Sequence, residues 1–169
     1  MNLYDIPTHD KSPKIVNAII EIPKGCSVKY EYHADYNVFE YDRSLDSAMV
    51  YPASYGFIPN TYCEDGDPLD ILVISQRPLM TGTFVQAKVL GVLDMTDDGK
   101  KDYKVLAVPL KYGKRYRNLQ DVEPMFLEIS KNFFLHYKDL QPGEGKVSCD
   151  KGWIDRADSY DIINSCVNK

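Results

Sequence analysis

The sequence has few of the residues that build common metal and redox sites. Its four cysteines, Cys26, Cys63, Cys149 and Cys166, are far apart and form no C-x-x-C pair, which argues against a zinc site. A chain of 169 residues can bury a core of its own, so we expect reduced thiols rather than disulfides. The three histidines are equally scattered. Neither a histidine metal site nor a Ser-His-Asp triad is therefore expected.

Long apolar runs and an excess of positive charge are also missing. No segment approaches the roughly twenty apolar residues that a membrane-spanning helix requires. Residues 1–10 carry two acids and lack the basic stretch and apolar run of a signal peptide. The net charge of −5 disfavours nucleic-acid binding, because that binding draws most of its affinity from a basic surface. We expect a soluble, cytoplasmic protein without membrane or nucleic-acid partners.

What is present is an ordinary globular composition with unevenly distributed charge. With 44% hydrophobic and 27% charged residues, the chain is predicted to form a single domain over residues 1–169. Residues 20–104 contain 14 acidic and 8 basic residues, whereas the remainder contains 11 acidic and 12 basic ones. The acidity is therefore concentrated in one segment.

Periodicity and turn signals predict strands in the first two thirds of the chain. β-branched and alternating patterns predict strands over residues 15–22, 28–32, 38–41, 69–74, 83–95 and 104–108. Asn37 is suited to a positive φ in the hairpin turn between the strands at 28–32 and 38–41. Gly91 permits a bulge or bend in the strand at 83–95. Several short strands joined by turns indicate a small closed β-barrel.

Helical signals follow near the end of the chain. Asp121 is predicted to cap a helix that has Pro124 in its first turn. Four-residue steps continue this helix through Met125, Ile129, Phe133 and Tyr137, before a stop at residues 141–143. A second helix is predicted to begin near Asp155 and to run through Cys166. The fold class is therefore α+β, mainly β, with two flanking C-terminal helices.

The most informative motif is the hexapeptide DGDPLD at residues 65–70, which is immediately followed by a buried strand. Like charges so close together are costly unless a cation lies among them. Pro68 cannot extend a central strand, so the segment must bend and direct Asp65, Asp67 and Asp70 toward one point. The spacing does not fit an EF-hand, because the sixth loop position would be Asp70 rather than glycine.

A second acidic turn, DDGKKD at residues 97–102, joins two predicted strands. Alone, it is most simply a solvated hairpin. Together with the first motif, it provides oxygen ligands without histidine or cysteine, a set that favours hard cations and Mg²⁺ above all. Mg²⁺ held in this way commonly serves phosphate chemistry.

Two basic residues and one tyrosine near these acids are candidates for substrate binding, although each has a simpler structural explanation. Lys29 could pair with Glu31 on the same strand face. Arg43 could form a surface ion pair with a neighbouring aspartate, worth at most about 1 kcal/mol. Tyr55 could be a core aromatic with a hydrogen-bonded hydroxyl. Composition alone does not assign these three residues to a site.

The order of the motifs resembles the soluble inorganic pyrophosphatases of family I, the Mg²⁺-dependent bacterial type. The resemblance covers roughly residues 15–153. It rests on IEIP at 20–23, KYE at 29–31, DR at 42–43, YPASYGFIP at 51–59, DGDPLD at 65–70, GVLDMTD at 91–97, DYK at 102–104 and FFLHYK at 133–138. It implies a five-stranded, OB-like closed barrel with flanking helices.

The resemblance also implies the roles of individual residues. An inorganic diphosphatase of this kind hydrolyses pyrophosphate to two orthophosphates through in-line attack by a metal-activated hydroxide. Asp67 would be the catalytic base. The implied metal ligands are Asp65, Asp70, Asp97, Asp102, Glu21 and Glu31. The implied phosphate-binding residues are Lys29, Arg43, Tyr55, Lys104, Tyr137 and Lys138. Asp98 stands where the family often has glutamate, which puts a direct role for its shorter side chain in doubt.

The implied cofactor is Mg²⁺, several ions per site, with Mn²⁺ or Zn²⁺ as possible substitutes. The resemblance further implies a homohexamer. Two alternatives remain open at this point. One is a metal-dependent hydrolase of another phosphoanhydride, such as a nucleotide, and the other is a non-catalytic OB-type binding module.

Overall fold

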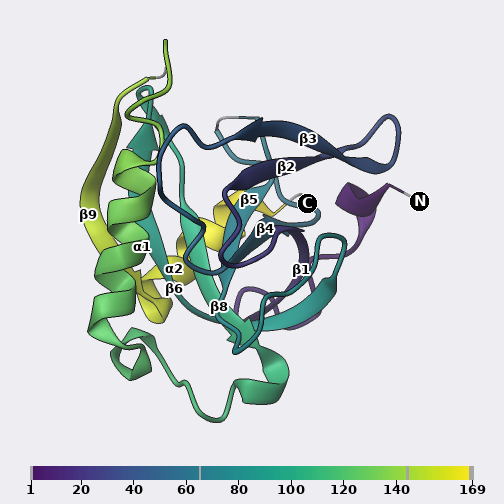
Figure 1. Cartoon of the computed structure of the whole chain (residues 1–169). Helices are drawn as coiled ribbons and strands as arrows, with labels where there is room; N and C mark the ends of the chain where they lie inside the picture. Colours follow the sequence, from purple (N-terminus) through teal and green to yellow (C-terminus); the bar gives the residue numbers. More distant parts are fainter. Residues whose placement is uncertain (1, 65, 144, 168–169) are drawn as a thin grey trace.

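Five strands of the main sheet close into a barrel (Figure 1). The computed structural model describes residues 2–64, 66–143 and 145–167. Neighbouring strands follow the order β1, β4, β5, β8 and β6, and β6 pairs again with β1. Their bounds are Ile15–Ile22 for β1, Ser54–Ile58 for β4, Leu69–Val73 for β5, Phe84–Asp97 for β6 and Lys104–Pro109 for β8. The predicted mainly β fold with a closed five-stranded barrel is confirmed.

Buried, mostly apolar runs explain why these strands form the barrel wall. Residues 16–22 of β1 are all buried, and so is every residue of β4. On β5, Ile71 and Val73 join one apolar cluster with Ile163, whereas Leu72 joins a second cluster with Phe133. Strands buried on both faces need apolar residues at successive positions rather than at alternate ones. The two faces of β5 therefore pack against different parts of the chain.

Two helices and one further strand complete the main body. Helix α1 spans Pro124–His136, strand β9 spans Val147–Asp155, and helix α2 spans Arg156–Cys166. Strand β9 pairs with the outer part of β6, and α1 lies beside β9 on the same flank of the barrel (Figure 1). Short 3-10 helices lie at Leu3–Asp5 (η1), Leu110–Tyr112 (η2) and Leu119–Asp121 (η3). The two predicted C-terminal helices are both present.

Two hairpins extend from the barrel. Strands β2 (Val28–His33) and β3 (Val38–Ser44) form a separate two-stranded sheet, in which Asn37 has the predicted positive φ, +55°. Strand β6 continues past the barrel into a hairpin with β7 (Lys100–Lys101). Earlier in β6, the pairing with β8 shifts register between Val89 and Gly91, which confirms the predicted irregularity at this glycine.

The start of α1 differs from the prediction. Asp121 is not the cap; instead the Glu123 carboxylate accepts a hydrogen bond from the backbone N–H of Phe126 at 3.0 Å. Met125 and Ile129 have exposed fractions of 61% and 52%, so they do not belong to the buried face. That face turns toward the barrel through Phe133 and its neighbours. Strict four-residue steps drift around a helix that has 3.6 residues per turn, which is why the pattern misplaced the face.

Three strands were absent from the predictions, one of them β7, whose two residues fall within the predicted acidic turn. Strand β4 lies within the YPASYGFIP segment, where prolines at both ends and an internal glycine mask a strand pattern. Strand β9 has no fully buried residue and mixes charged residues with glycine, so it lacks a clear apolar period. Because β9 lies between the two helices, the predicted order of strands first and helices last is also wrong.

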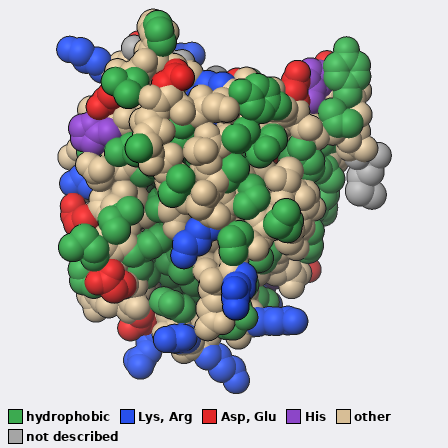
Figure 2. Space-filling model, viewed as in Figure 1, with side chains coloured by type: hydrophobic (Ala, Val, Ile, Leu, Met, Phe, Trp, Pro, Cys, Tyr) green, Lys and Arg blue, Asp and Glu red, His purple; other side chains and the backbone are tan. Residues whose placement is uncertain are grey.

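Charge is distributed unevenly over the surface. Basic side chains gather at the lower edge of the face in Figure 2, where Figure 1 places the segment between β8 and α1. This segment contains the exposed residues Lys111, Lys114, Arg115 and Arg117.

In the part of the chain described by the structure, no helix is long and apolar enough to cross a membrane.

Gly56 tests how closely β4 packs on β1. An added Cβ would lie 1.9 Å from the carbonyl oxygen of Ile19, a backbone atom that cannot swing away. We expect Gly56→Ala to lower the free energy of unfolding by about 3 kcal/mol or more. Gly25→Ala is the control, since no atom lies within 4 Å and only its φ of +82° opposes a side chain; about 1 kcal/mol is expected. Denaturant unfolding measures both, and equal losses would contradict the close packing.

Candidate active site

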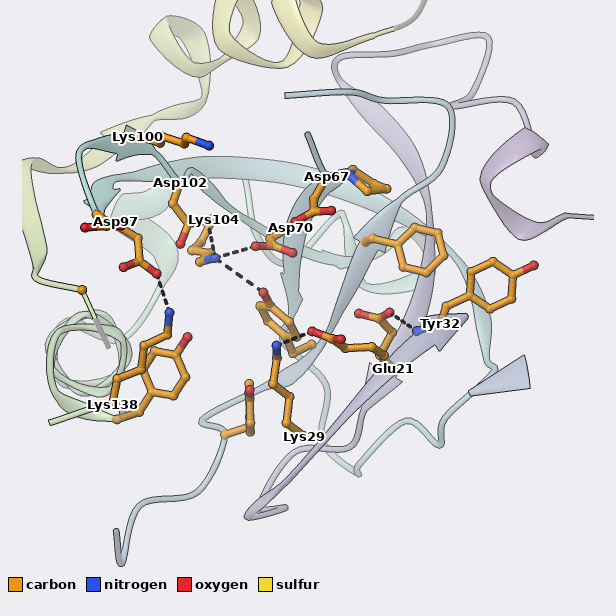
Figure 3. Close-up of a pocket in the computed structure, with 18 of the residues that line it drawn as sticks. Glu21, Lys29, Tyr32, Asp67, Asp70, Asp97, Lys100, Asp102, Lys104 and Lys138 are labelled. Atoms are coloured by element: carbon orange, nitrogen blue, oxygen red, sulfur yellow. Dashed lines mark hydrogen bonds and ion pairs between the residues drawn. The ribbon is translucent and has the colours of Figure 1, made fainter. Parts of the chain in front are cut away.

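A cleft of about 680 Å³ opens at one end of the barrel, and charged side chains from several strands and from the end of α1 line it (Figure 3). Most of the residues that the sequence singled out meet here. They are Glu21, Lys29, Glu31, Tyr55, Asp67, Asp70, Asp97, Asp102, Lys104, Tyr137 and Lys138. Asp65, the first residue of the acidic hexapeptide, lies outside the described residues.

The register between neighbouring strands brings together the side chains at the centre of the cleft. The parallel strands β5 and β8 pair Asp70 with Lys104, and β4 presents Tyr55 beside them. The backbone bends at Gly66, which has a φ of +96°, before β5 begins at Leu69. This bend confirms that the chain turns sharply just before Asp70, as the hexapeptide predicted.

Lys104 is a nearly fully buried cation held between two carboxylates. Its Nζ lies 2.5 Å from Asp70 Oδ2 and 2.5 Å from Asp102 Oδ1, and 3.5 Å from the hydroxyl of Tyr55 (Figure 3). Burial disfavours the charged ammonium, but the charges of Asp102 and Asp70 outweigh it and hold the pKa of Lys104 well above its ordinary value. Lys104 therefore stays protonated.

Asp70 shows the opposite balance. Burial raises the pKa of its carboxyl to about 6, and the nearby charge of Asp102 adds to this effect. The ion pair and hydrogen bond from Lys104 oppose the rise without cancelling it. One ammonium shared by two carboxylates leaves an excess of negative charge, so a further cation would be favourable at this point.

Glu21 is a second strongly perturbed carboxylate of the cleft. Its exposed fraction is 8%, and burial raises its pKa to about 8, with further contributions from Asp70 and Glu31. The backbone N–H of Tyr32 donates to Glu21 Oε1 at 2.8 Å and partly offsets the rise (Figure 3). The Tyr32 N–H and the charge of Lys29 offset only part of the cost of an ionised Glu21, so a cation bound nearby would favour the charged form.

The β2–β3 sheet contributes a second group of charges. Lys29 forms ion pairs with Glu31 and with Asp42, the latter at 3.1 Å. Burial disfavours the Lys29 ammonium, but the bonds to these carboxylates raise its pKa overall. Arg43 pairs with Lys29 across the strands and donates to Asp42 Oδ2 at 2.7 Å. It does not line the cleft, so the structure places it beside the site rather than within it.

The third group of charges joins the β6–β7 hairpin to the end of α1. The ammonium of Lys138 donates to Asp97 Oδ2 at 2.5 Å, across the cleft mouth (Figure 3). Tyr137 precedes it and stacks on Phe133 with ring centroids 5.1 Å apart. The hairpin turn is formed by Asp98 and Gly99, both with positive φ, as in a two-residue turn.

Several lining residues were not identified from the sequence. Lys100 is directly opposite Asp97 in the hairpin, so a two-residue turn would have predicted that both face the cleft. Tyr51 is buried among Tyr55 and Phe133, and its apolar surroundings gave no separate signal. Tyr4 reaches the cleft from η1, a position that no local pattern reveals.

The side chains that line the cleft fit a divalent metal ion. Among the described residues, no three potential ligands are yet close enough together to coordinate one ion. All candidate donors are carboxylate oxygens, which hard cations prefer. Asp70 and Glu21 have raised pKa values, so negative charge is undercompensated where these acids meet. A bound divalent cation would relieve that excess and favour their ionised forms.

Comparisons with known proteins decide the family. The inorganic pyrophosphatase family model matches residues 18–169. The chain belongs to this family. An inorganic pyrophosphatase from Aeropyrum pernix is 41% identical over 165 residues, covering 95% of this chain and 92% of that protein. The crystal structure of the inorganic pyrophosphatase from Thermus thermophilus matches with a TM-score of 0.92 and 38% identity, covering 99% of this chain and 97% of the other.

A second pyrophosphatase structure agrees. The enzyme from Coxiella burnetii gives a TM-score of 0.89 at 35% identity, covering 96% of this chain and 98% of that one. The family inferred from the motif order is thereby confirmed.

Glu21 should make the stability of the metal-free protein depend on pH. Its folded-state pKa of about 8 lies above the ordinary 4.5, so the folded protein keeps a proton that the unfolded chain releases. Stability conferred by this proton is present below the ordinary pKa and is lost as the pH rises toward the folded-state value. Glu21→Gln cannot titrate, so the drop in stability from about pH 5.5 to about pH 9 should shrink.

Denaturant unfolding in EDTA at both pH values measures this effect. Glu40→Gln is the control, because Glu40 is an exposed carboxylate on β3. The control should retain the pH dependence of the unsubstituted protein. An identical dependence for Glu21→Gln and the unsubstituted protein would contradict the raised pKa of Glu21.

Proposed function

We propose that this chain hydrolyses inorganic pyrophosphate to two orthophosphates, and that the cleft is its active site. The observation that carries the proposal is the pairing of acids and lysines throughout one cleft, in a member of the inorganic pyrophosphatase family. Pyrophosphate is a small polyanion, so a protein with a net charge of −5 must bind it through clustered cations. Lys29, Lys104 and Lys138 supply cations on three sides of the cleft.

The ion pairs of the cleft indicate how ligands would be accommodated. Lys104 is paired with Asp70 and Asp102, Lys138 with Asp97, and Lys29 with Glu31. Phosphate oxygens are alternative partners for the ammonium groups, and divalent cations are alternative partners for the carboxylates. Phosphate oxygens would therefore take the place of carboxylates beside the lysines, and divalent cations would take the place of lysines beside the carboxylates. Each ligand would leave free the groups that bind the other, so each would make the other easier to bind.

Carboxylates would hold the divalent cations. We assign Asp65, Asp70 and Asp102 to the tightest ion, with Asp70 also contacting a second. Asp97 and Asp102 would hold an ion that accompanies the substrate, and Glu21 and Glu31 another. When bound, such ions neutralise phosphate charge and lower the pKa of water so that it can act as a nucleophile near neutral pH.

Asp67 is our assignment for the general base. It lies in the bend before β5 and lines the same cleft as Asp70. One of its carboxylate oxygens would accept the proton of the attacking water. The charge that develops on the leaving phosphate, where phosphoryl transfer is most sensitive to electrostatics, would be stabilised by lysine and tyrosine side chains. These are Lys29, Lys104, Lys138, Tyr55 and Tyr137. Arg43 would act from beside Lys29.

Three finer features rest on the family resemblance. We propose Mg²⁺ as the principal ion, with Mn²⁺ or Zn²⁺ as substitutes, because the donors are all carboxylates. We further propose a homohexamer of single-domain chains, located in the cytoplasm. The exposed apolar side chains of Met125 and Ile129 on α1 are compatible with burial against another copy.

Phosphate release from pyrophosphate or ATP, each with Mg²⁺, tests the function. We expect two phosphates per pyrophosphate consumed, no turnover in EDTA, and a far lower kcat/KM for ATP. Faster hydrolysis of ATP would favour another phosphoanhydride as the substrate. Absence of hydrolysis, together with saturable binding of an oligonucleotide or oligosaccharide, would favour a binding module.

Asp67→Asn and Asp70→Asn separate a base from a metal ligand. Asp67→Asn removes a proton acceptor, so the rate should fall about 10²- to 10⁴-fold while Mg²⁺ affinity stays near that of the unsubstituted protein. Asp70→Asn removes charge that would balance a metal, so Mg²⁺ affinity itself should fall. Rate measured against Mg²⁺ concentration distinguishes them, with thermal unfolding as the control for folding. Equal rescue of both variants by added Mg²⁺ would contradict the assignment of Asp67 as the base.

A further inference from the structure

The β6–β7 hairpin has two faces with different surroundings. Thr96 is paired with Lys101 and Asp97 with Lys100, and the side chains of directly opposed residues share a face. Asp97 and Lys100 line the cleft. Thr96 and Lys101 therefore project from the other face of the sheet, in which β9 also pairs with β6.

A three-residue ion cluster occupies this outer face. Lys101 Nζ lies 2.7 Å from Asp94 Oδ1 on β6 and 2.6 Å from Asp150 Oδ2 on β9. The hydroxyl of Thr96 donates to the same Asp150 oxygen at 3.0 Å. The Lys101 ammonium thus links β7 to both β6 and β9. Asp94, Lys101 and Asp150 are hereafter the outer triad.

The outer triad contains a charge that cannot easily be left alone. The side chain of Asp94 is 4% exposed, whereas that of Lys101 is 31% exposed. A buried carboxylate that loses its only neutralising partner is strongly unfavourable, because water cannot replace the lost interaction. Among the described residues, Asp94 has its ion pair with Lys101 alone. Lys101 is therefore held firmly to β6.

Two cleft carboxylates depend on the path of this hairpin. Asp97 lies one residue after Thr96, and Asp102 follows Lys101 directly. The backbone N–H of Asp102 donates to the carbonyl of Met95 at 3.0 Å, which continues the hairpin pairing. Strand β7 is only two residues long, so backbone pairing alone gives it little hold on β6.

We propose that Lys101 is a positioning residue, which fixes the β6–β7 hairpin on its outer face through Asp94 and Asp150 and so sets the spacing of Asp97 and Asp102 for divalent-cation binding. The proposal rests on the function proposed above. Lys101 is not among the residues that line the cleft. Its effect passes through the backbone, in the way that residues behind metal ligands orient those ligands.

The test compares divalent-cation binding across four variants in the full-length protein. Lys101→Met should raise the dissociation constant for Mg²⁺, measured calorimetrically on metal-free protein, by about 10-fold, within the range known for residues that orient metal ligands. Lys101→Arg preserves the charge and should bind nearly as well as the unsubstituted protein. Lys151→Met is the matched control, since Lys151 is an exposed lysine next to Asp150 and should leave affinity unchanged.

The double variant Asp94→Asn/Lys101→Met separates positioning from stability. Neutralising Asp94 removes the unpaired buried charge, so thermal stability should recover toward that of the unsubstituted protein. The hairpin still lacks its clamp, so Mg²⁺ affinity should stay about 10-fold weak. In the rate assay, high Mg²⁺ should restore kcat for Lys101→Met while the Mg²⁺ requirement stays raised.

Two results would overturn the proposal. One is a normal Mg²⁺ affinity for Lys101→Met. The other is an affinity that recovers together with stability in the double variant, which would reduce the outer triad to a structural role. Failure of the unsubstituted protein to hydrolyse pyrophosphate would instead contradict the proposed function, and the calorimetric comparison would still decide whether Lys101 positions the hairpin.

Discussion

The buried ammonium of Lys104 between Asp70 and Asp102 is the interaction on which the cleft depends. Lys104 is the shared partner of two carboxylates at the barrel wall, so loss of its ammonium would leave both without this ion pair. Parallel pairing of β5 with β8 brings Asp70 and Lys104 together. The closed barrel therefore does more than bury apolar surface, since its register fixes which opposite charges meet. A shift of one residue would turn Lys104 to the other face of the sheet.

The same compensation is repeated with less burial toward the cleft mouth. The side chains of Lys29 and Lys138 are 19% and 16% exposed, against 4% for Lys104, and solvent weakens their ion pairs with Glu31 and Asp97. Groups at the mouth are thus easier to separate than those at the wall. This gradient suits a site that must keep its shape at the centre and exchange partners with incoming ions at its edge.

The sequence carried the parts of this arrangement that local pattern encodes. Apolar runs located most barrel strands, and the hexapeptide at 65–70 located the bend before Asp70. Strand β9 lacks such a run, so neither it nor the outer triad was predicted. The helix face was misplaced because Met125 and Ile129 fit a four-residue step without being buried. Lys100 and Tyr4 reach the cleft through pairing and tertiary packing, which local periodicity does not encode.

The hairpin shows why a site of this kind needs structure on both of its faces. Its inner face presents Asp97 and Lys100 to the cleft, while its outer face is fastened by the outer triad. Carboxylates that repel one another tend to move apart, and a two-residue strand resists that tendency weakly. Fastening the opposite face opposes the repulsion without occupying the cleft. The acidic turn, which resembles a solvated hairpin in isolation, is thereby tied to two neighbouring strands through Asp94 of β6 and Asp150 of β9.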